Sequence, residues 1–216
     1  MYKRQEEEKA QFLEIVHSNN ELLQQLIADI LDLSKIEAGT LEFTFSEVDV
    51  NQLMFDIEQL FRMRLEDKSA VIQIIRQTPP DECVMYTDRN RLQQVVSNFM
   101  TNAVKFTDEG SITFGYNRCA EGLYFYVKDT GSGIPEDKVN HIFERFVRVE
   151  QNKKGTGLGL AICEMIIRKL GGKIGVESEY GKGSTFWFTL PINGRQIKEQ
   201  GTEIAVSYTH LTLPTT

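Results

Sequence analysis

Three polar side chains recur at helical spacing in the middle of the chain. Asn98, Asn102 and Lys105 stand at i, i+4 and i+7 of the segment 88–106, so they stack on one side of a helix. A carboxamide oxygen can bind Mg²⁺, and an ammonium group neutralises phosphate charge. The row is therefore typical of a metal–polyphosphate site, although a solvated helix face explains this segment equally well when it is taken alone.

A carboxylate ends the most regular strand pattern of the sequence. The strand expected over residues 123–128 has apolar side chains on one face, and Asp129 continues that face. Because a buried and unpaired carboxylate is costly, Asp129 favours a ligand that donates hydrogen bonds, such as an adenine amino group. Gly131 and Gly133 follow at once and would let a base approach the backbone. A strand-end Asp that starts a glycine turn is the plainer alternative.

Alternating glycines open another expected helix. The run Gly155-Thr156-Gly157-Leu158-Gly159 would expose main-chain N–H groups to an anion at the start of that helix. It has neither the spacing of a Rossmann fingerprint nor the Gly-Lys-Ser/Thr of a Walker A loop. The preceding loop carries four cations and suggests a mobile lid, with an ordinary solvated loop as the alternative, above all for the two lysines. These cations are Arg145, Arg148, Lys153 and Lys154.

The elements that must position these residues follow from periodicity and from turn residues. Helices are expected over 5–37, 50–68, 88–106 (capped by Thr87 or Asp88), 135–143 and 158–170, and strands over 41–45, 71–75, 84–87, 111–116, 123–128, 174–179 and 184–190. Runs of strands beside segregated helices predict an α+β sandwich, in which one sheet has helices on one face. Residues 193–216 are polar with no clear period and are left outside the fold, as a disordered or foreign tail.

The first helix has an apolar stripe that a single helix cannot bury. Val16, Leu23 and Ile30 recur every seven residues, and further apolar positions widen the stripe beyond a two-stranded seam. The width suits a helix inside a bundle. We therefore expect partner helices, either from another chain or from sequence that precedes this segment.

Composition limits the classes of protein. The chain has 216 residues, 41% apolar and 25% charged, with a net charge of −7, which fits a globular domain with an appendage or two small domains. The acidic balance argues against nucleic acid or an anionic membrane as the main partner. No run reaches the roughly 18 apolar residues of a membrane helix. Cys83, Cys119 and Cys163 form no Cys-x-x-Cys pair, which favours a reduced, cytoplasmic compartment and leaves open a membrane anchor in a longer parent protein.

The order of the motifs carries more information than any one of them. Over about residues 45–191 the series resembles the N, G1, F, G2 and G3 boxes of the histidine-kinase branch of the GHKL ATPases. Upstream, residues 19–39 resemble the second dimerisation helix of such kinases and its exit. The matching boxes are Asn98-x-x-x-Asn102-x-x-Lys105-Phe106-Thr107, Asp129-x-Gly131-x-Gly133-Ile134, Ile142-Phe143-Glu144-Arg145-Phe146, Gly155-Thr156-Gly157-Leu158-Gly159 and Gly181-Lys182-Gly183-Ser184-Thr185-Phe186.

This resemblance implies the Bergerat fold, a sandwich of one mixed sheet with helices on one face, and ATP with Mg²⁺ as cofactors. It implies transfer of the γ-phosphoryl group to a histidine, with catalysis by positioning and electrostatics. Asn102 would bind Mg²⁺, and Asn98, Lys105 and Arg145 would act at the phosphates as the catalytic group. Asp129 would bind the adenine amino group. The other implied nucleotide-binding residues are Gly131, Gly133, Ile134, Gly155, Thr156, Gly157, Leu158 and Gly159, with Thr185 in support of Asp129.

One departure from the family pattern concerns the phosphate-accepting histidine. The family carries it in a His-Glu-x-Arg-Thr-Pro context on the first dimerisation helix, and this context is absent from the sequence, where Ser-Asn-Asn follows His17. We interpret His17 as a surface or bundle histidine. The expected organisation is a second dimerisation helix over 1–39, a catalytic domain over 40–192 and a tail over 193–216. The implied partners are a histidine-bearing dimerisation helix, a response-regulator receiver domain and a second copy of the full-length parent.

Three other classes of protein compete with this interpretation. GHKL ATPases that hydrolyse ATP with water place a Glu where this chain has Asn98, and an Asn cannot act as a general base. A non-catalytic nucleotide-binding module would be expected to have lost Asn102, Lys105 or Asp129. A serine-kinase anti-sigma factor normally lacks a long N-terminal helix. The sequence therefore favours a histidine kinase fragment that does not phosphorylate itself.

Overall fold

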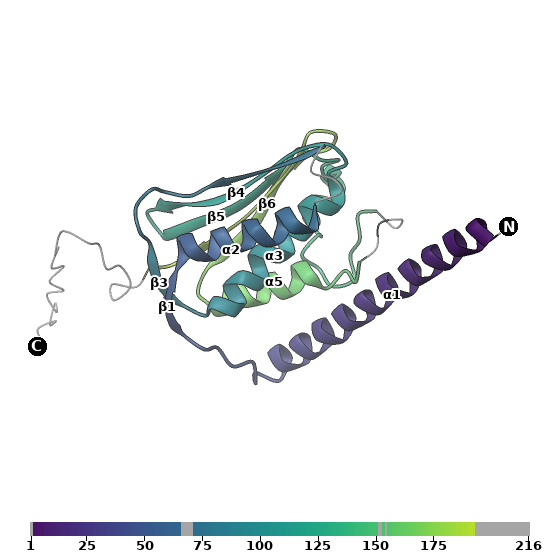
Figure 1. Cartoon of the computed structure of the whole chain (residues 1–216). Coiled ribbons are helices and arrows are strands. Elements are labelled where there is room, and N and C mark those ends of the chain that lie inside the picture. Colours follow the sequence, from purple (N-terminus) through teal and green to yellow (C-terminus); the bar gives the residue numbers. More distant parts are fainter. Residues whose placement is uncertain (1, 66–70, 151–152, 154, 193–216) are drawn as a thin grey trace, which may run out of the picture.

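The computed structural model describes residues 2–65, 71–150, 153 and 155–192, which form two layers and one long flanking helix (Figure 1). The expected tail, residues 193–216, lies outside the described residues. The elements in chain order are α1 (Tyr2–Glu37), β1 (Ser46–Asp49), α2 (Val50–Arg64), β2 (Ile72–Gln77), β3 (Val84–Thr87), α3 (Arg89–Phe106), β4 (Gly110–Cys119), β5 (Gly122–Asp129), α4 (Glu136–Val139), α5 (Gly159–Lys169), β6 (Lys173–Glu179) and β7 (Gly183–Leu190).

The main sheet is mixed, and it has five strands in the order β2-β4-β5-β7-β6. β2 pairs with β4 in parallel, and the other neighbours are antiparallel. Helices α2, α3 and α5 lie together against one face of this sheet (Figure 1). The predicted α+β sandwich is therefore confirmed, with one addition: β1 and β3 form a separate two-stranded antiparallel sheet.

Two predicted boundaries on the N-terminal side are wrong. No strand forms over 41–45; the strand is β1, where Ser46 pairs with Thr87. The main-chain N–H of Thr44 instead donates to Asp88 Oδ2 at 2.8 Å, so this stretch is tied to the start of α3. Helix α2 ends at Arg64 rather than at residue 68, because Leu65 is its C-cap.

The short helix after Pro135 is also shorter than predicted. α4 has four residues, and the chain then turns through residues 140–146 rather than continuing as a helix to Phe143. The N–H of His141 donates to the carbonyl of Lys138, and the N–H of Glu144 donates to that of His141. These tight i→i+3 bonds replace the α-helical ladder.

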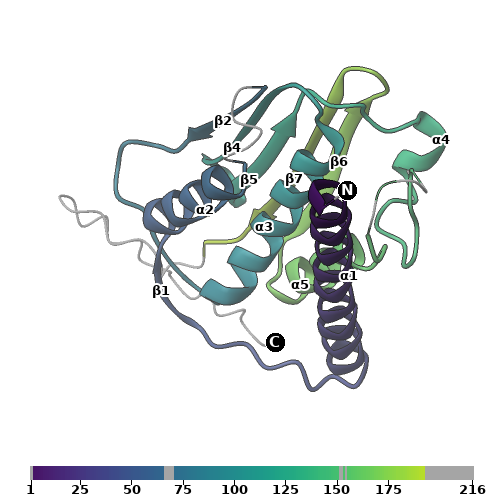
Figure 2. The ribbon, with the colours of Figure 1, turned by 45° about the vertical axis from the view of Figure 1, so that its right-hand side comes forward.

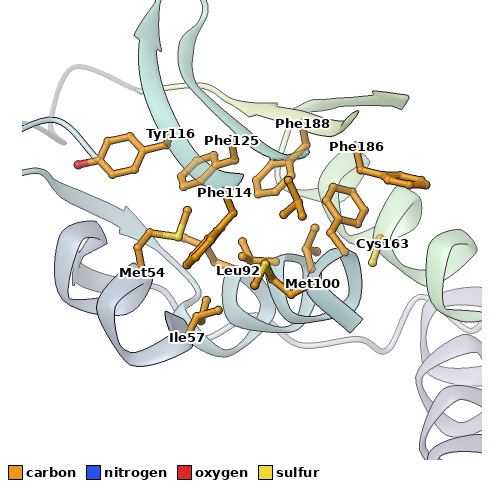
Figure 3. Packing of buried hydrophobic residues seen from close by; sticks show 14 of the residues in the cluster. Met54, Ile57, Leu92, Met100, Phe114, Tyr116, Phe125, Cys163, Phe186 and Phe188 are labelled. Carbon is orange, nitrogen blue, oxygen red and sulfur yellow. The ribbon is translucent and has the colours of Figure 1, made fainter. Parts of the chain in front are cut away.

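One face of helix α3 is buried in the core, and another carries the polar row of Asn98, Asn102 and Lys105. Asp88 caps it through a hydrogen bond from the N–H of Arg91 to Oδ1 at 3.0 Å. Phe99 lies 5.3 Å from the ring of Phe186 and 6.0 Å from that of Phe188. Figure 3 shows buried side chains of this helix, among them Leu92 and Met100, beneath the aromatic side chains of the sheet. The predicted apolar stripe of this helix is buried throughout: Leu92, Val95, Val96, Phe99 and Ala103. Burial of this face leaves the opposite face of α3 for chemistry.

Helix α1 is the expected long helix, and it lies alongside α5 and α3 (Figure 2). Gly39, with φ of +68°, follows its end. Its apolar stripe stays exposed, as expected for a helix without its bundle partners; Val16, Leu23 and Ile30 are exposed by 48%, 55% and 49%. Within the described residues, no helix is long and apolar enough to cross a membrane.

A buried ion-pair cluster ties α2 to β2 and leads to a prediction on stability. Glu58 is 8% exposed and pairs with Arg62 at 2.8 Å and with Arg76 at 2.7 Å. Burial alone would raise the pKa of the Glu58 carboxyl, but the hydrogen bonds and charges of Arg76 and Arg62 outweigh burial and hold this pKa below its ordinary value. A depressed folded-state pKa stabilises the fold above the unfolded-state value, and this contribution is lost as the pH falls through the folded-state pKa.

We therefore expect Glu58→Gln to lower the free energy of unfolding at pH 7 by about 1.5–3 kcal/mol. The deficit should shrink below the ordinary carboxyl range, near pH 4 and lower. Urea denaturation at several pH values measures it. Asp56→Asn is the control, because its partner Arg89 is at a similar 2.7 Å but both side chains are about 40% exposed, so its effect should stay below about 1 kcal/mol. Equal losses for the two variants, or a pH-independent loss for Glu58→Gln, would contradict this account.

Candidate active site

The polar face of α3 lines a cavity of about 610 Å³. This size falls within the roughly 300–1,000 Å³ of small-molecule sites. Asn98, Asn102 and Lys105 all line it, and Asn102 Nδ2 donates to Asn98 Oδ1 at 3.3 Å. The i, i+4, i+7 spacing has therefore placed two carboxamides and an ammonium group along one wall.

Asp129 lines the same cavity from the end of β5. It is 4% exposed, and its Oδ1 accepts hydrogen bonds from the N–H of Gly131 at 2.9 Å and of Ser184 at 3.3 Å. Burial raises the pKa of the Asp129 carboxyl, and these N–H groups oppose that rise. Among the described residues, both donors to this carboxylate bind Oδ1, so Oδ2 can accept from a ligand that donates a hydrogen bond.

The glycine-rich loop before α5 approaches α3 closely. A Cβ on Gly159 would stand 2.2 Å from Asn98 Nδ2, and one on Gly155 would stand 2.8 Å from Lys105 Nζ. Any side chain at these positions would displace the polar row. The Oγ1 of Thr156 accepts a hydrogen bond from the N–H of Leu158 at 3.2 Å, which shapes the loop just before α5 begins. The loop and the row thus face each other across the cavity.

Cations gather around Lys105 at the wall of the cavity. Burial lowers the pKa of the Lys105 ammonium, and the neighbouring charges of Arg148 and Lys153 lower it further, against the opposing effect of Glu150. Lys153 Nζ donates to the carbonyl of Lys105 at 2.8 Å. Like charges held this closely are stabilised by an anion, so this end of the cavity is suited to phosphate.

Most of the predicted site residues lie at the cavity, and four do not line it. Gly133, Ile134, Gly155, Thr156, Gly157 and Gly159 line it, in addition to the α3 row and Asp129. Gly131 contributes through its N–H to Asp129, and Leu158 is fully buried behind the loop. The guanidinium of Arg145 instead pairs with Glu37 of α1. Thr185 pairs with Lys128, the residue before Asp129, so it faces the other side of the sheet. Ser184 supplies the N–H that supports Asp129.

The structure adds cavity residues that sequence reasoning did not single out. Leu22, Gln25 and Asp29 bring α1 into the cavity wall. Asp29 is 3% exposed, whereas most of the α1 side chains that the structure describes are exposed. Its position among the polar residues of α1 gave no local signal, because its burial depends on where α1 docks. Ser184 was within reach of prediction, since strand pairing between β5 and β7 places it opposite Asp129.

Comparisons with known proteins agree with this geometry. Residues 87–194 match the family model of the histidine kinase-, DNA gyrase B- and HSP90-like ATPases. The sensor histidine kinase RcsC of Escherichia coli (strain K12) is 36% identical over 189 residues, which cover 86% of this chain and 20% of RcsC. The chain thus spans about a fifth of the length of this relative.

Solved structures show the same fold. Full-length ShkA, crystallised in complex with AMPPNP, superposes with a TM-score of 0.74 at 32% identity, over 86% of this chain and 39% of ShkA. Histidine kinase ThkA, in complex with the response regulator protein TrrA, gives a TM-score of 0.67 at 26% identity, over 85% of this chain and 51% of ThkA. The family model covers half of the chain, and the relatives are sensor histidine kinases. The chain therefore belongs to the histidine kinase-, DNA gyrase B- and HSP90-like ATPases and carries the catalytic domain of a sensor histidine kinase.

Proposed function

We propose that this chain is a fragment of a two-component histidine kinase that binds Mg²⁺–ATP in the cavity and transfers the γ-phosphoryl group to a histidine of a separate dimerisation helix. One observation carries the proposal. A single cavity has a buried hydrogen-bond acceptor, Asp129, at one place and carboxamides, cations and a glycine loop at another. This arrangement matches a molecule with a hydrogen-bond-donating base and a polyanionic tail.

The residues present fit ATP and Mg²⁺. Asp129 Oδ2 would accept from the adenine amino group, while Gly131 and Ser184 hold the carboxylate in place. Asn102 would bind Mg²⁺ through its amide oxygen, with Asn98 beside the phosphates. Lys105 would neutralise phosphate charge. The bound nucleotide supplies the phosphoryl group; the chain supplies orientation and electrostatic stabilisation, as is usual for phosphoryl transfer.

The residue type at position 98 favours transfer over hydrolysis. Asn98 lies in the α3 row, where its carboxamide meets Asn102 and the loop at Gly159. A carboxamide cannot take a proton from water, so this position offers no general base for hydrolysis. A nucleophile from another helix would have to supply its own reactivity, as a histidine does.

We propose that residues 1–39 are the second helix of a dimerisation domain and that residues 40–192 are the catalytic domain. The exposed stripe on α1 supports this division, because apolar side chains such as Leu23, Ile27 and Leu31, exposed by 55%, 52% and 55%, require partner helices. We propose a second copy of the parent protein as the source of part of that bundle. We propose a response-regulator receiver domain as the partner in signalling, by analogy with ThkA.

The first test of the proposed function concerns Mg²⁺–ATP binding. Asp129→Asn replaces the Oδ2 acceptor by a donor, and Asn102→Ala removes the metal ligand. Each should weaken the binding of a non-hydrolysable ATP analogue at least tenfold, about 1.4 kcal/mol, in calorimetric titration. The loss in Asn102→Ala should depend on Mg²⁺. Asn117→Ala, on an exposed part of β4, is the control and should bind like the parent. Equal affinity in all four proteins would refute the site.

The stability of the Asp129 variant separates a binding role from a structural one. A carboxyl whose folded-state pKa is raised contributes stability that is fully present below its unfolded-state pKa and is lost as the pH rises through the folded-state pKa, so the ionised form costs stability. Asn keeps the Oδ1 acceptor for Gly131 and Ser184. Asp129→Asn should therefore unfold at the same or a higher urea concentration than the parent at pH 7, even though it binds ATP poorly.

A further test of the proposed function concerns self-phosphorylation. His17 is exposed and lies five residues, about 7.5 Å along the helix axis, before Leu22, where α1 reaches the cavity. Phosphoryl transfer tolerates little misplacement of the acceptor. Incubation with γ-labelled ATP should therefore leave little acid-labile label on this chain alone. The label should appear on a partner that supplies a His-Glu-x-Arg-Thr-Pro helix. Strong label on the chain alone that His17→Gln abolishes would make His17 the acceptor.

A further inference from the structure

Helix α1 contributes one buried carboxylate to the cavity, and the proposed reaction does not use it. Asp29 is 3% exposed, while its neighbours Ala28 and Ile30 are exposed. It lines the cavity together with Leu22 and Gln25 of the same helix. A carboxylate is costly to bury, so this position requires an explanation.

Asp29 is bonded directly to the glycine-rich loop. Its Oδ2 accepts a hydrogen bond from the Thr156 hydroxyl at 2.8 Å, and its Oδ1 accepts from Gln25 Nε2 at 2.8 Å. The Thr156 oxygen in turn accepts from the N–H of Leu158 at 3.2 Å. The orientation of the Thr156 hydroxyl in the loop therefore depends on a residue of α1, 127 positions away.

Two further carboxylates on α1 hold the helix to the catalytic layer. Asp32 accepts from Arg91 Nη1 at 3.0 Å and from Gln94 Nε2 at 2.9 Å. Glu37 pairs with Arg145. Thr156 and Arg145, two of the groups expected to contact phosphate, thus form hydrogen bonds with α1 carboxylates in this structure.

The charge of Asp29 opposes a polyanion in the same cavity. Within the part of the chain that the structure describes, the donors to its carboxylate are Gln25 and Thr156, and neither carries a positive charge that would offset the negative one. Negative charges that share one partly buried cavity repel each other more strongly than they would in bulk water. A triphosphate bound at the loop would meet this repulsion, whereas an uncharged nucleoside would not.

We propose that Asp29 is a positioning residue through which docked α1 restrains the phosphate loop and lowers affinity for the triphosphate. The inference rests on the proposed nucleotide site and adds a coupling to it. When α1 docks, Thr156 donates to Asp29 and a carboxylate stands in the cavity. Binding of the triphosphate and docking of α1 therefore disfavour each other. By linkage the effect is reciprocal: ATP must loosen α1 as much as α1 weakens ATP.

The test measures the affinities of ATP, ADP and adenosine for the parent chain and for the variant Asp29→Asn. Asp29→Asn keeps the size of the side chain and the Oδ1 acceptor for Gln25, and it removes the charge. Its affinity for ATP should rise about three- to tenfold, that for ADP less, and that for adenosine by less than about twofold. The ratio of triphosphate to adenosine affinity is the readout, because a loss of packing alone would not change it.

Asp56→Asn is the control, since it removes the same charge at a residue of α2 that pairs with Arg89 and does not line the cavity. Its triphosphate-to-adenosine ratio should equal that of the parent. Amide hydrogen exchange over residues 22–37 should quicken when ATP is added to the parent and change less in Asp29→Asn.

Three results would contradict the proposed role of Asp29. An unchanged ratio in Asp29→Asn, with ATP still bound, would overturn this inference and leave the nucleotide site intact. A weaker binding of Mg²⁺–ATP would also overturn it, because that is the behaviour of a carboxylate that binds the metal. Absence of ATP binding in the parent and in every variant would overturn both this inference and the proposed function.

Discussion

The site depends on a carboxylate that the sheet holds in the interior. Asp129 ends β5, opposite Ser184 of β7, and the antiparallel pairing of these strands directs the Ser184 N–H toward it. The turn after β5 returns the Gly131 N–H to the same oxygen. The cost of burying Asp129 is thus met in part by the main chain, and the remaining acceptor gives the cavity its preference for a donor.

Helix α3 converts this local arrangement into a cavity that suits an elongated ligand. Its apolar face packs on the sheet through Phe99, which leaves the polar row of the helix to line the cavity. The glycines of the loop before α5 allow that loop to come within contact distance of Asn98 and Lys105. The base-like and phosphate-like ends are therefore fixed by the same packing, and neither can move without disturbing the core.

The sequence was sufficient for features that are local. The buried stripe of α3 and the strand face that ends in Asp129 follow from spacing and residue type, and the structure confirms both. Of the two predicted caps of α3, Thr87 and Asp88, the structure has Asp88. The prediction of a strand at 41–45 instead of 46–49 is wrong because the position of this strand depends on pairing with β3, whose first residue, Val84, pairs with Asp49. The family resemblance implied Thr185 as the support of Asp129, whereas the register of β5 and β7 places Ser184 opposite Asp129.

Contacts made by α1 could not be predicted from the sequence, because they depend on how a helix docks on a layer formed by residues far along the chain. The pairing of Arg145 with Glu37 and the burial of Asp29 both belong to this class. Residue types alone could not show that Arg145 would be held away from the cavity by a carboxylate of another element. With α1 docked, Arg145 therefore pairs with Glu37 and does not line the cavity, although it was expected to contact phosphate.

The central claim is that one cavity accommodates both ends of one nucleotide, and competition between its two halves tests this most directly. Adenosine and Mg²⁺–tripolyphosphate should each displace a fluorescent ATP analogue from the parent chain, and each should still bind when the other is saturating. Asp129→Asn should weaken only adenosine. If tripolyphosphate fails to displace the analogue, or if the two halves exclude each other, the account of a shared cavity with separate ends is contradicted.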